Sequence, residues 1–209
     1  MARRRKVGNI LALAVLSVLV ERPMHPYEMA TALRERGKDN DMKINWGSLY
    51  TVVQNLDKHG FIETTGTSRE GRRPERTVYA ITDAGRDEMQ DWVRELVGAP
   101  QREYPKFEAA LSTMGALPPD EALTLLQHRL RRLDLQVASE RAALEQVARE
   151  VPRLFLVEVE YRLAMRQAEA DWLRGLLKEL ADDSFPGMSL WREYHTSGPW
   201  AQKEEEPPD

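Results

Sequence analysis

The stretch that most constrains the fold of this chain is residues 44–85, where a helix, a strand, a basic turn and a second strand follow without a gap. Asn45 is a suitable N-cap residue and Gly60 a suitable C′ residue, so the stretch predicts a helix from Trp46 to His59. The apolar residues of that helix lie within about 60° of one another on a helical wheel. They are Leu49, Val52, Val53 and Leu56.

The two stretches that follow this helix predict a β-hairpin. Residues 61–65 and 77–81 are rich in β-branched and aromatic side chains, and they flank a turn rich in Gly, Ser and Arg. A helix followed by such a hairpin is the order of a winged helix-turn-helix. The hairpin tip has a net positive charge, for which phosphate is the natural partner. Its arginines are Arg69, Arg72, Arg73 and Arg76.

The outer face of the predicted helix suits the major groove of DNA. Gln and Asn side chains can pair with adenine edges there, and Thr can contact a thymine methyl group. Gln54 and Thr51 lie near the centre of that face and are expected to read bases, and Tyr50 is expected to contact a phosphate. A solvated amphipathic helix beside a charged hairpin explains each element alone, but their order favours DNA binding. The predicted DNA-binding residues are Lys43, Ser48, Tyr50, Thr51, Gln54, Asn55, Lys58, Arg69, Arg72, Arg73 and Arg76.

Short motifs follow one another in a fixed order through residues 8–90. They are Pro23-Met24-His25 with Tyr27-Glu28-Met29, Gly47-Ser48-Leu49-Tyr50, Leu56 with Gly60-Phe61-Ile62, and Tyr79-Ala80-Ile81-Thr82-Asp83-Ala84-Gly85. This ordered set resembles the N-terminal domain of the PadR family of bacterial transcriptional regulators. The resemblance implies a winged helix-turn-helix that represses transcription. Two positions depart from the family pattern, because Pro26 stands where Gly is usual and Trp46 stands where Pro is frequent.

Three further helices are expected around the hairpin. Residues 7–20 are apolar nearly all round, which is typical of a buried helix, and they are too short to span a bilayer. A second helix is expected from Tyr27 to Gly37, preceded by His25, which is expected to be a structural histidine and not a pH switch. A third, from Asp83 to about Val97, should end at residues 98–100, the expected domain boundary.

The second half of the chain carries a coiled-coil pattern. After a helix start at Pro118, apolar residues recur at alternating steps of three and four up to Pro152. Glu140 fills one place in this seam and should pair with Arg162 or Arg166, because an unpaired buried carboxylate is costly. The residues predicted to hold a dimer are Leu123, Leu126, Leu130, Leu133, Val137, Leu144, Val147 and Trp172.

A second long helix, antiparallel to the first, is expected up to about Leu180. Its predicted seam runs through Leu154, Val157, Tyr161, Ala164, Ala168, Trp172 and Leu176. Two helices alone cannot cover both apolar seams, so a homodimer is expected. Residues 168–173 also resemble the C-terminal helical dimerisation domain found in one branch of the PadR family.

The predicted fold class is therefore mainly α, a winged helix-turn-helix with a two-stranded wing followed by a long antiparallel helical dimerisation domain. The expected parts are residues 1–98, residues 99–182, and an irregular tail at 183–209 whose last residues are disordered. Residues 1–80 hold 14 Lys and Arg against 9 Asp and Glu, net +5, whereas the rest holds 16 against 25, net −9. The basic part coincides with the predicted DNA-binding domain.

These patterns predict a cytoplasmic, cofactor-free regulator that binds a roughly palindromic operator as a homodimer, and the resemblance implies that it is a repressor. There is no cysteine and no histidine pair with metal-ligand spacing, and no nucleophile elbow or Gly-rich phosphate loop, so an enzyme is not expected. A winged-helix module for protein contacts is the rival interpretation. The resemblance implies a small hydrophobic or aromatic effector, expected near Trp172, Trp191 and Tyr194, although core packing also explains these side chains.

Overall fold

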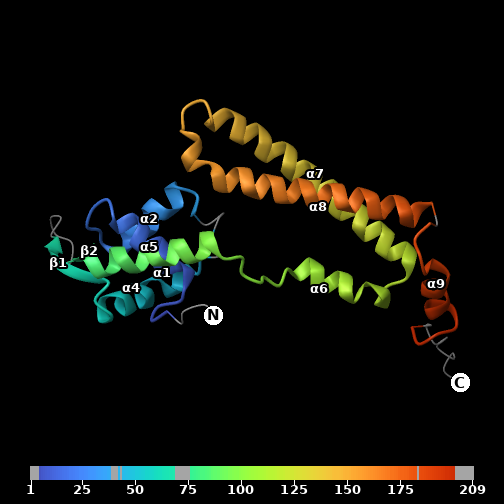
Figure 1. Ribbon diagram of the computed structural model, residues 1–209, viewed down its shortest axis with the longest axis horizontal. Helices are drawn as coiled ribbons and strands as arrows, with labels where there is room; N and C mark the ends of the chain where they lie inside the picture. The colour runs from blue at the N-terminus through green and yellow to red at the C-terminus, as the bar shows by residue number, and fades with distance from the viewer. Residues whose placement is uncertain (1–4, 39–41, 43, 69–75, 183, 201–209) are drawn as a thin grey trace, which may run out of the picture. The chain divides into compact units, whose positions relative to one another are not determined.

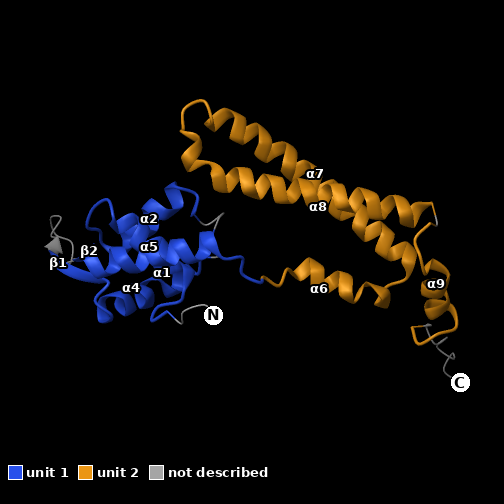
Figure 2. Ribbon diagram, viewed as in Figure 1, with its two compact units in different colours: residues 1–102 blue, residues 103–209 orange. Residues whose placement is uncertain are grey.

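The chain forms two compact units, residues 1–102 and residues 103–209 (Figures 1 and 2). The computed structural model describes residues 5–38, 42, 44–68, 76–182 and 184–200, with the side chains of 67, 68 and 76 excepted. Each unit has its own hydrophobic core. Most of the described chain is helical and its sheet has two antiparallel strands, which confirms the predicted fold class. No helix among the described residues is both long and apolar enough to cross a membrane.

The first unit is built around one buried helix. Helix α1 packs against α2, α4, α5 and β2, and it is buried on nearly every side, as its apolar run predicted. The unit consists of α1 (Ile10–Leu19), α2 (Pro26–Glu35), a 3₁₀ turn η1 (Trp46–Ser48), α4 (Leu49–Lys58), strands β1 (Ile62–Ser68) and β2 (Arg76–Ile81), and α5 (Asp83–Gly98).

Helix α2 begins at a reciprocal cap made by His25 and Glu28. The Nδ1 atom of His25 accepts a hydrogen bond of 3.1 Å from the backbone N–H of Tyr27, and Oε2 of Glu28 accepts one of 2.8 Å from the backbone N–H of His25. His25 therefore has the structural role that its sequence context predicted. The hydrogen bond from the His25 backbone lowers the pKa of the Glu28 carboxyl below 4.5, and the nearby Arg22 contributes a smaller lowering of that pKa.

The cap at Glu28 makes the stability of the first unit depend on pH. Because the folded state lowers the pKa of this carboxyl, its contribution is complete above about pH 4.5 and is lost as the pH falls through the lowered folded value. Glu28→Gln should lower the free energy of unfolding at pH 7 and flatten its decline between pH 5 and pH 3. Urea unfolding across that range measures both effects. Glu63→Gln, on exposed β1, is the control that should leave the decline unchanged.

The wing is hydrogen-bonded on both sides of β2. Strands β1 and β2 pair antiparallel, with Ile62 opposite Ile81, and a bulge interrupts the register between Thr64 and Gly66. On the other side, Met24 and Tyr79 exchange two backbone hydrogen bonds of 3.0 Å each. The short motif before α2 thus serves as a third, one-residue strand of the wing.

The junction between α4, the wing and α5 is closed by local hydrogen bonds. Gly60 has a φ of 72° and ends α4 in a Schellman motif, in which the N–H of Phe61 donates to the Leu56 carbonyl over 3.0 Å. The hydroxyl of Thr82 donates to the Gly60 carbonyl over 2.7 Å and accepts from the N–H of Gly85 over 3.1 Å. Helix α5 therefore starts directly after the end of the wing and at its predicted first residue, Asp83.

The second unit is a long helical hairpin with short helices at one end. It contains α6 (Lys106–Ser112), η2 (Met114–Ala116), α7 (Pro119–Val147), η3 (Arg153–Phe155), α8 (Val157–Ala181) and α9 (Met188–Thr196). Helices α7 and α8 lie side by side and antiparallel, because Asp134 pairs with Arg174 whereas Glu140, further along α7, pairs with Arg162 (Figure 1). This arrangement is the predicted one.

Glu140 has the partners that its place in the seam predicted. Its carboxylate lies 3.7 Å from Nε of Arg162 and forms a closer ion pair with Arg166. All three side chains are about one quarter to one third exposed, so the pairing offsets the cost of partial burial. The predicted ion pair is confirmed.

The predicted irregular tail is wrong over Met188–Thr196, which form helix α9. Met188 and Trp191 are buried on one face of this helix and join the core of the second unit. Nε1 of Trp191 donates a 2.9 Å hydrogen bond to the Leu117 carbonyl. Tertiary packing thus stabilises a helix too short to be stable alone. The predicted disorder of the last residues falls on 201–209, outside the described residues.

Candidate nucleic-acid interface

Helix α4 presents one polar face to solvent. Its apolar residues Leu49, Val52, Val53 and Leu56 are buried in the core of the first unit, as their spacing predicted. Ser48 is half-buried, and its hydroxyl donates a 2.8 Å hydrogen bond to the Asn45 carbonyl. The structure brings the other predicted groove-facing residues together as exposed side chains on the opposite face. They are Tyr50, Thr51, Gln54, Asn55 and Lys58.

Trp46 secures the start of this helix. The ring packs against the core of the first unit, and the guanidinium carbon of Arg34 on α2 lies 4.1 Å from the ring centroid. Such a cation–π contact stabilises the pair by about 0.5–2 kcal/mol. Asn45 caps η1 by accepting a 3.1 Å hydrogen bond from the N–H of Gly47. The large side chain of Trp46 therefore joins the turn before α4 to helix α2.

The wing carries the other predicted phosphate contacts. Strand β2 begins at Arg76, and β1 ends at Ser68, so both strands lead toward the arginine-bearing turn. Arg69, Arg72, Arg73 and Lys43 lie outside the described residues, as does the side chain of Arg76. The structure therefore describes the two strands that lead to the predicted arginines, and the contacts of these arginines and of Lys43 remain predictions.

The predicted seam of α7 serves the contact within one chain. Leu126, Leu133 and Val137 are buried, and Leu123, Leu130 and Leu144 are partly buried, whereas Val147 is exposed. Buried residues of α7 share their core cluster with Ala170 and Leu173 of α8. Helix α8 covers the buried part of this face of α7.

Most of the predicted seam of the second helix faces solvent, whereas Leu176 is partly buried against the core of the second unit. Val157, Tyr161, Met165, Ala168 and Trp172, here called the α8 stripe, lie within about 80° of one another on a helical wheel. All five are exposed, with 67% of Tyr161 and 51% of Trp172 accessible. Phe107 of α6 contacts one end of the stripe, with its ring edge-on to that of Trp172 at a centroid distance of 6.4 Å. A bare apolar stripe of this kind marks an interaction surface.

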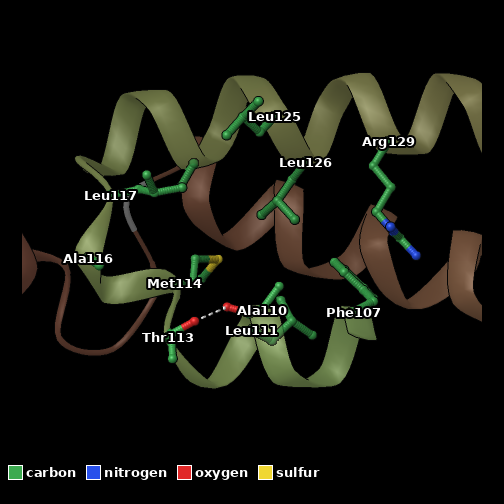
Figure 3. A pocket seen from close by; sticks show the side chains of 11 residues that line it. Phe107, Ala110, Leu111, Thr113, Met114, Ala116, Leu117, Leu125, Leu126 and Arg129 are labelled. Carbon is green, nitrogen blue, oxygen red and sulfur yellow. Dashed lines mark hydrogen bonds between the residues drawn. The ribbon is translucent and has the colours of Figure 1, made fainter. Parts of the chain in front are cut away.

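The structure brings two of the three predicted effector residues together. Trp191 and Tyr194 line a hollow of about 250 Å³ beside η2, together with Phe185 and Leu190 of the C-terminal segment. Trp172 instead contacts Phe107, which lines a second and larger pocket between α6 and α7 (Figure 3). No sequence pattern predicted this pocket, because residues of α6 and α7 form it only after the chain turns back at Pro118.

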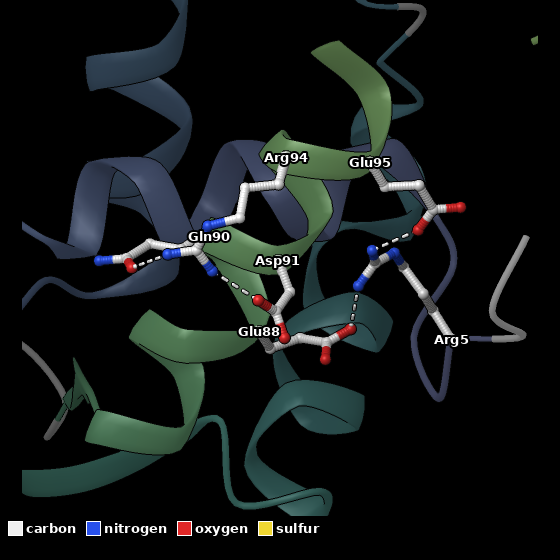
Figure 4. A network of polar contacts seen from close by, with 6 residues as sticks. All are labelled: Arg5, Glu88, Gln90, Asp91, Arg94 and Glu95. Atoms are coloured by element: carbon white, nitrogen blue, oxygen red, sulfur yellow. Dashed lines mark hydrogen bonds and ion pairs between the residues drawn. The ribbon is translucent and has the colours of Figure 1, made fainter. Parts of the chain in front are cut away.

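A polar network fixes Arg5, the first described residue, to α5 (Figure 4). The guanidinium of Arg5 donates hydrogen bonds of 2.7 Å to Glu88 and 2.5 Å to Glu95, and it lies 5.0 Å from the ring centroid of Trp92. Its side chain is 7% exposed, so Arg5 is held by the protein and is not available to a phosphate. On the same helix, Arg94 pairs with Asp91 over 2.6 Å.

Comparison with known proteins finds a family and relatives that share this architecture. Residues 15–91 match the family model described as the transcriptional regulator PadR-like family. The negative transcriptional regulator PadR of Bacillus subtilis (strain 168) is 22% identical over 139 residues, which cover 66% of this chain and 75% of that protein.

Solved structures with the same fold include two of Bacillus subtilis PadR. The complex with operator DNA has a TM-score of 0.67 at 19% identity and covers 82% of this chain and 99% of its own. The complex with p-coumaric acid has a TM-score of 0.67 at 18% identity and covers 83% and 99%. The family match and the curated relative confirm the predicted resemblance to PadR regulators, and the solved structures show the same fold. Through the helices and wing of residues 15–91, this chain is similar to the PadR-like family of transcriptional regulators.

Proposed function

We propose that this protein is a sequence-specific DNA-binding repressor that acts in the cytoplasm as a homodimer. The exposed polar face of α4, fixed on a buried apolar face and followed by a wing, is the observation that carries this proposal. The related Bacillus subtilis protein is a negative regulator, and a solved structure with this fold holds operator DNA.

Gln54 and Thr51 are the proposed base-reading residues. Both are exposed near the centre of the polar face of α4, where a side chain can reach base edges in the major groove. Gln54→Ala should change the preferred base at one position of each half-site, at a cost of about 1–3 kcal/mol for the favoured sequence. Selection of bound sequences from random duplexes measures this. Gln127→Ala, an exposed glutamine of α7, should leave the preference unchanged.

The wing is proposed to bind phosphate and not bases. Replacing Arg72 and Arg73 with Ala should weaken binding to all sequences alike, because phosphate contacts carry no sequence information. The log–log slope of affinity against salt concentration should fall by about 0.9 for each phosphate that no longer has an arginine partner. DNA titrations at several salt concentrations measure the slope, with Arg131→Ala on α7 as the control. An unchanged slope in the double variant would show that the wing does not contact DNA.

A second copy of the chain is the proposed partner of the α8 stripe. The stripe is apolar and exposed over several turns, and the neighbouring Leu154 and Phe155 of η3 are 74% and 64% exposed. A palindromic operator requires two copies of α4 related by a twofold axis, which an isologous contact between two α8 stripes supplies. This assignment replaces the α7 seam as the proposed dimer surface and keeps Trp172 in it.

A small aromatic compound is proposed to release the repressor from DNA. The fold of this chain is similar to that of a PadR solved with p-coumaric acid, an aromatic carboxylic acid. Such a compound can act only to the extent that it binds the DNA-free state more tightly than the DNA-bound state.

A further inference from the structure

The second unit contains an open apolar pocket of about 460 Å³ between α6, η2 and the first turns of α7. Side chains from all three elements point into it, as Figure 3 shows. Its volume lies within the range of small-molecule sites, about 300–1,000 Å³. The main contributors to its walls are Phe107, Leu111, Met114, Leu117, Leu125 and Leu126.

One end of this pocket is cationic. Arg129 is the charged residue of the lining, and its guanidinium carbon lies 3.6 Å from the Phe107 ring centroid. Nε of Arg129 donates a 2.6 Å hydrogen bond to Oε1 of Glu169, so this glutamate occupies one edge of the guanidinium. Among the described residues no partner contacts its Nη1 atom, which leaves a donor edge for a second acceptor.

A second arginine lies next to this end. An adjoining hollow of about 310 Å³ shares Leu125 and Arg129 with the pocket and is also lined by Arg132, His128 and Gln136. Arg132 forms no ion pair with any residue that the structure describes. The two arginines and Glu169 leave this end with a net charge of about +1, which complements a single carboxylate.

We propose that this pocket is the effector site and that it binds an apolar monocarboxylate, with the hydrocarbon or aryl body among the leucines and the carboxylate between Arg129 and Arg132. The regulatory role of this pocket rests on the proposed function, whereas the binding of the carboxylate does not. Burial against the apolar walls favours the hydrocarbon or aryl body, and the two guanidinium groups select the anion over its neutral amide.

The position of the pocket along the chain suggests how binding is transmitted. Helix α6 is the first element of the second unit after residues 99–105, which lead out of α5. The segment of α6 and η2 has a hollow on each side, because Leu111 and Met114 line both the pocket and the hollow beside α9. A bound molecule would contact Phe107 and Leu111 and compete for the Arg129 guanidinium, so it would shift α6 and the segment that leads to the DNA-binding unit.

The test uses full-length protein without DNA. Isothermal titration with 4-phenylbutyrate, 2-naphthylacetate and decanoate should show binding of at least one acid, and the matched neutral amides should bind at least about tenfold more weakly. Arg129→Gln with Arg132→Gln should raise the dissociation constant of that acid at least about tenfold and remove the preference over the amide. Arg131→Gln, an exposed arginine of α7 outside both hollows, should change neither.

Leu125→Gln is a second variant, chosen because this side chain is 49% exposed and its replacement should not disturb the core. It should weaken acid and amide alike. The proposed site is contradicted if none of the three acids binds, or if both variants bind the acid as tightly as the unaltered protein does. Acid binding that leaves operator affinity unchanged would overturn the effector role. A protein that binds the acids but no DNA would instead contradict the proposed function and leave the site standing.

Discussion

Replacing Gly85 with Ala is expected to destabilise the first unit by more than about 3 kcal/mol, the range of severe overpacking. A Cβ atom at this position would lie 1.9 Å from the carbonyl oxygen of Phe61 and 2.9 Å from its carbonyl carbon. Both are backbone atoms held by the Schellman motif that ends α4. Helix α5 would have to move away from the end of α4, and this movement would break the hydrogen bonds of Thr82.

Gly98→Ala is the matched control, since Gly98 ends the same helix and a Cβ atom there meets nothing within 4 Å. This change should leave stability unchanged or raise it by up to about 1 kcal/mol. Urea unfolding followed by circular dichroism compares the two variants. A Gly85→Ala protein as stable as the Gly98→Ala protein would contradict the proposed packing of α5 on Phe61.

Replacing Tyr161 and Met165 with Glu should convert the dimer into a monomer and lower operator affinity at least about 100-fold. Both side chains lie on the α8 stripe and are 67% and 49% exposed in the single chain, so the fold should survive. In a dimer, four unpaired carboxylates would enter an apolar contact, which costs several kcal/mol. A monomer also cannot read two half-sites together.

Val97→Glu tests whether an added charge on any exposed apolar residue dissociates the dimer. Val97 lies on α5, is 83% exposed and is outside the stripe, so this variant should remain dimeric. Light scattering measures the mass of each variant, and DNA titration measures its affinity. A double variant that stays dimeric at micromolar concentration would place the dimer contact on another surface.

Local patterns in the sequence predicted the DNA-binding unit well. The spacing of Leu49, Val52 and Leu56 set the buried face of α4, and the N-cap and C′ residues set its ends to within three residues, because these signals act between near neighbours. The basic turn between the two strands was recognised from the sequence in the same way, and the phosphate contacts of its arginines remain predictions.

Heptad spacing was less informative, because it shows that a helix face is covered without showing what covers it. The face of α7 with Leu126 and Leu133 is covered by α8 of the same chain. Helix α8 has apolar residues on two faces, and only the three-dimensional structure separates inner residues such as Leu173 from the outer α8 stripe.

Apart from the ion pair of Glu140 with Arg162 and Arg166, interactions between distant residues were not predicted from the sequence. The cation–π contact that gives Trp46 a role joins it to Arg34 on another helix. The ion pairs of Arg5 with Glu88 and Glu95 join residues more than 80 positions apart. Helix α9 has only nine residues, and its packing through Trp191 depends on a carbonyl 74 positions earlier.

Selection of bound duplexes from random DNA by the full-length protein tests the central claim most directly. A dimeric repressor that reads DNA through α4 should enrich an inverted repeat whose half-site centres lie about 34 Å, or one helical turn, apart. The Gln54→Ala protein should enrich a repeat changed at one position of each half-site. Recovery of sequences with no enriched site would contradict the claim and favour a winged-helix module that binds proteins.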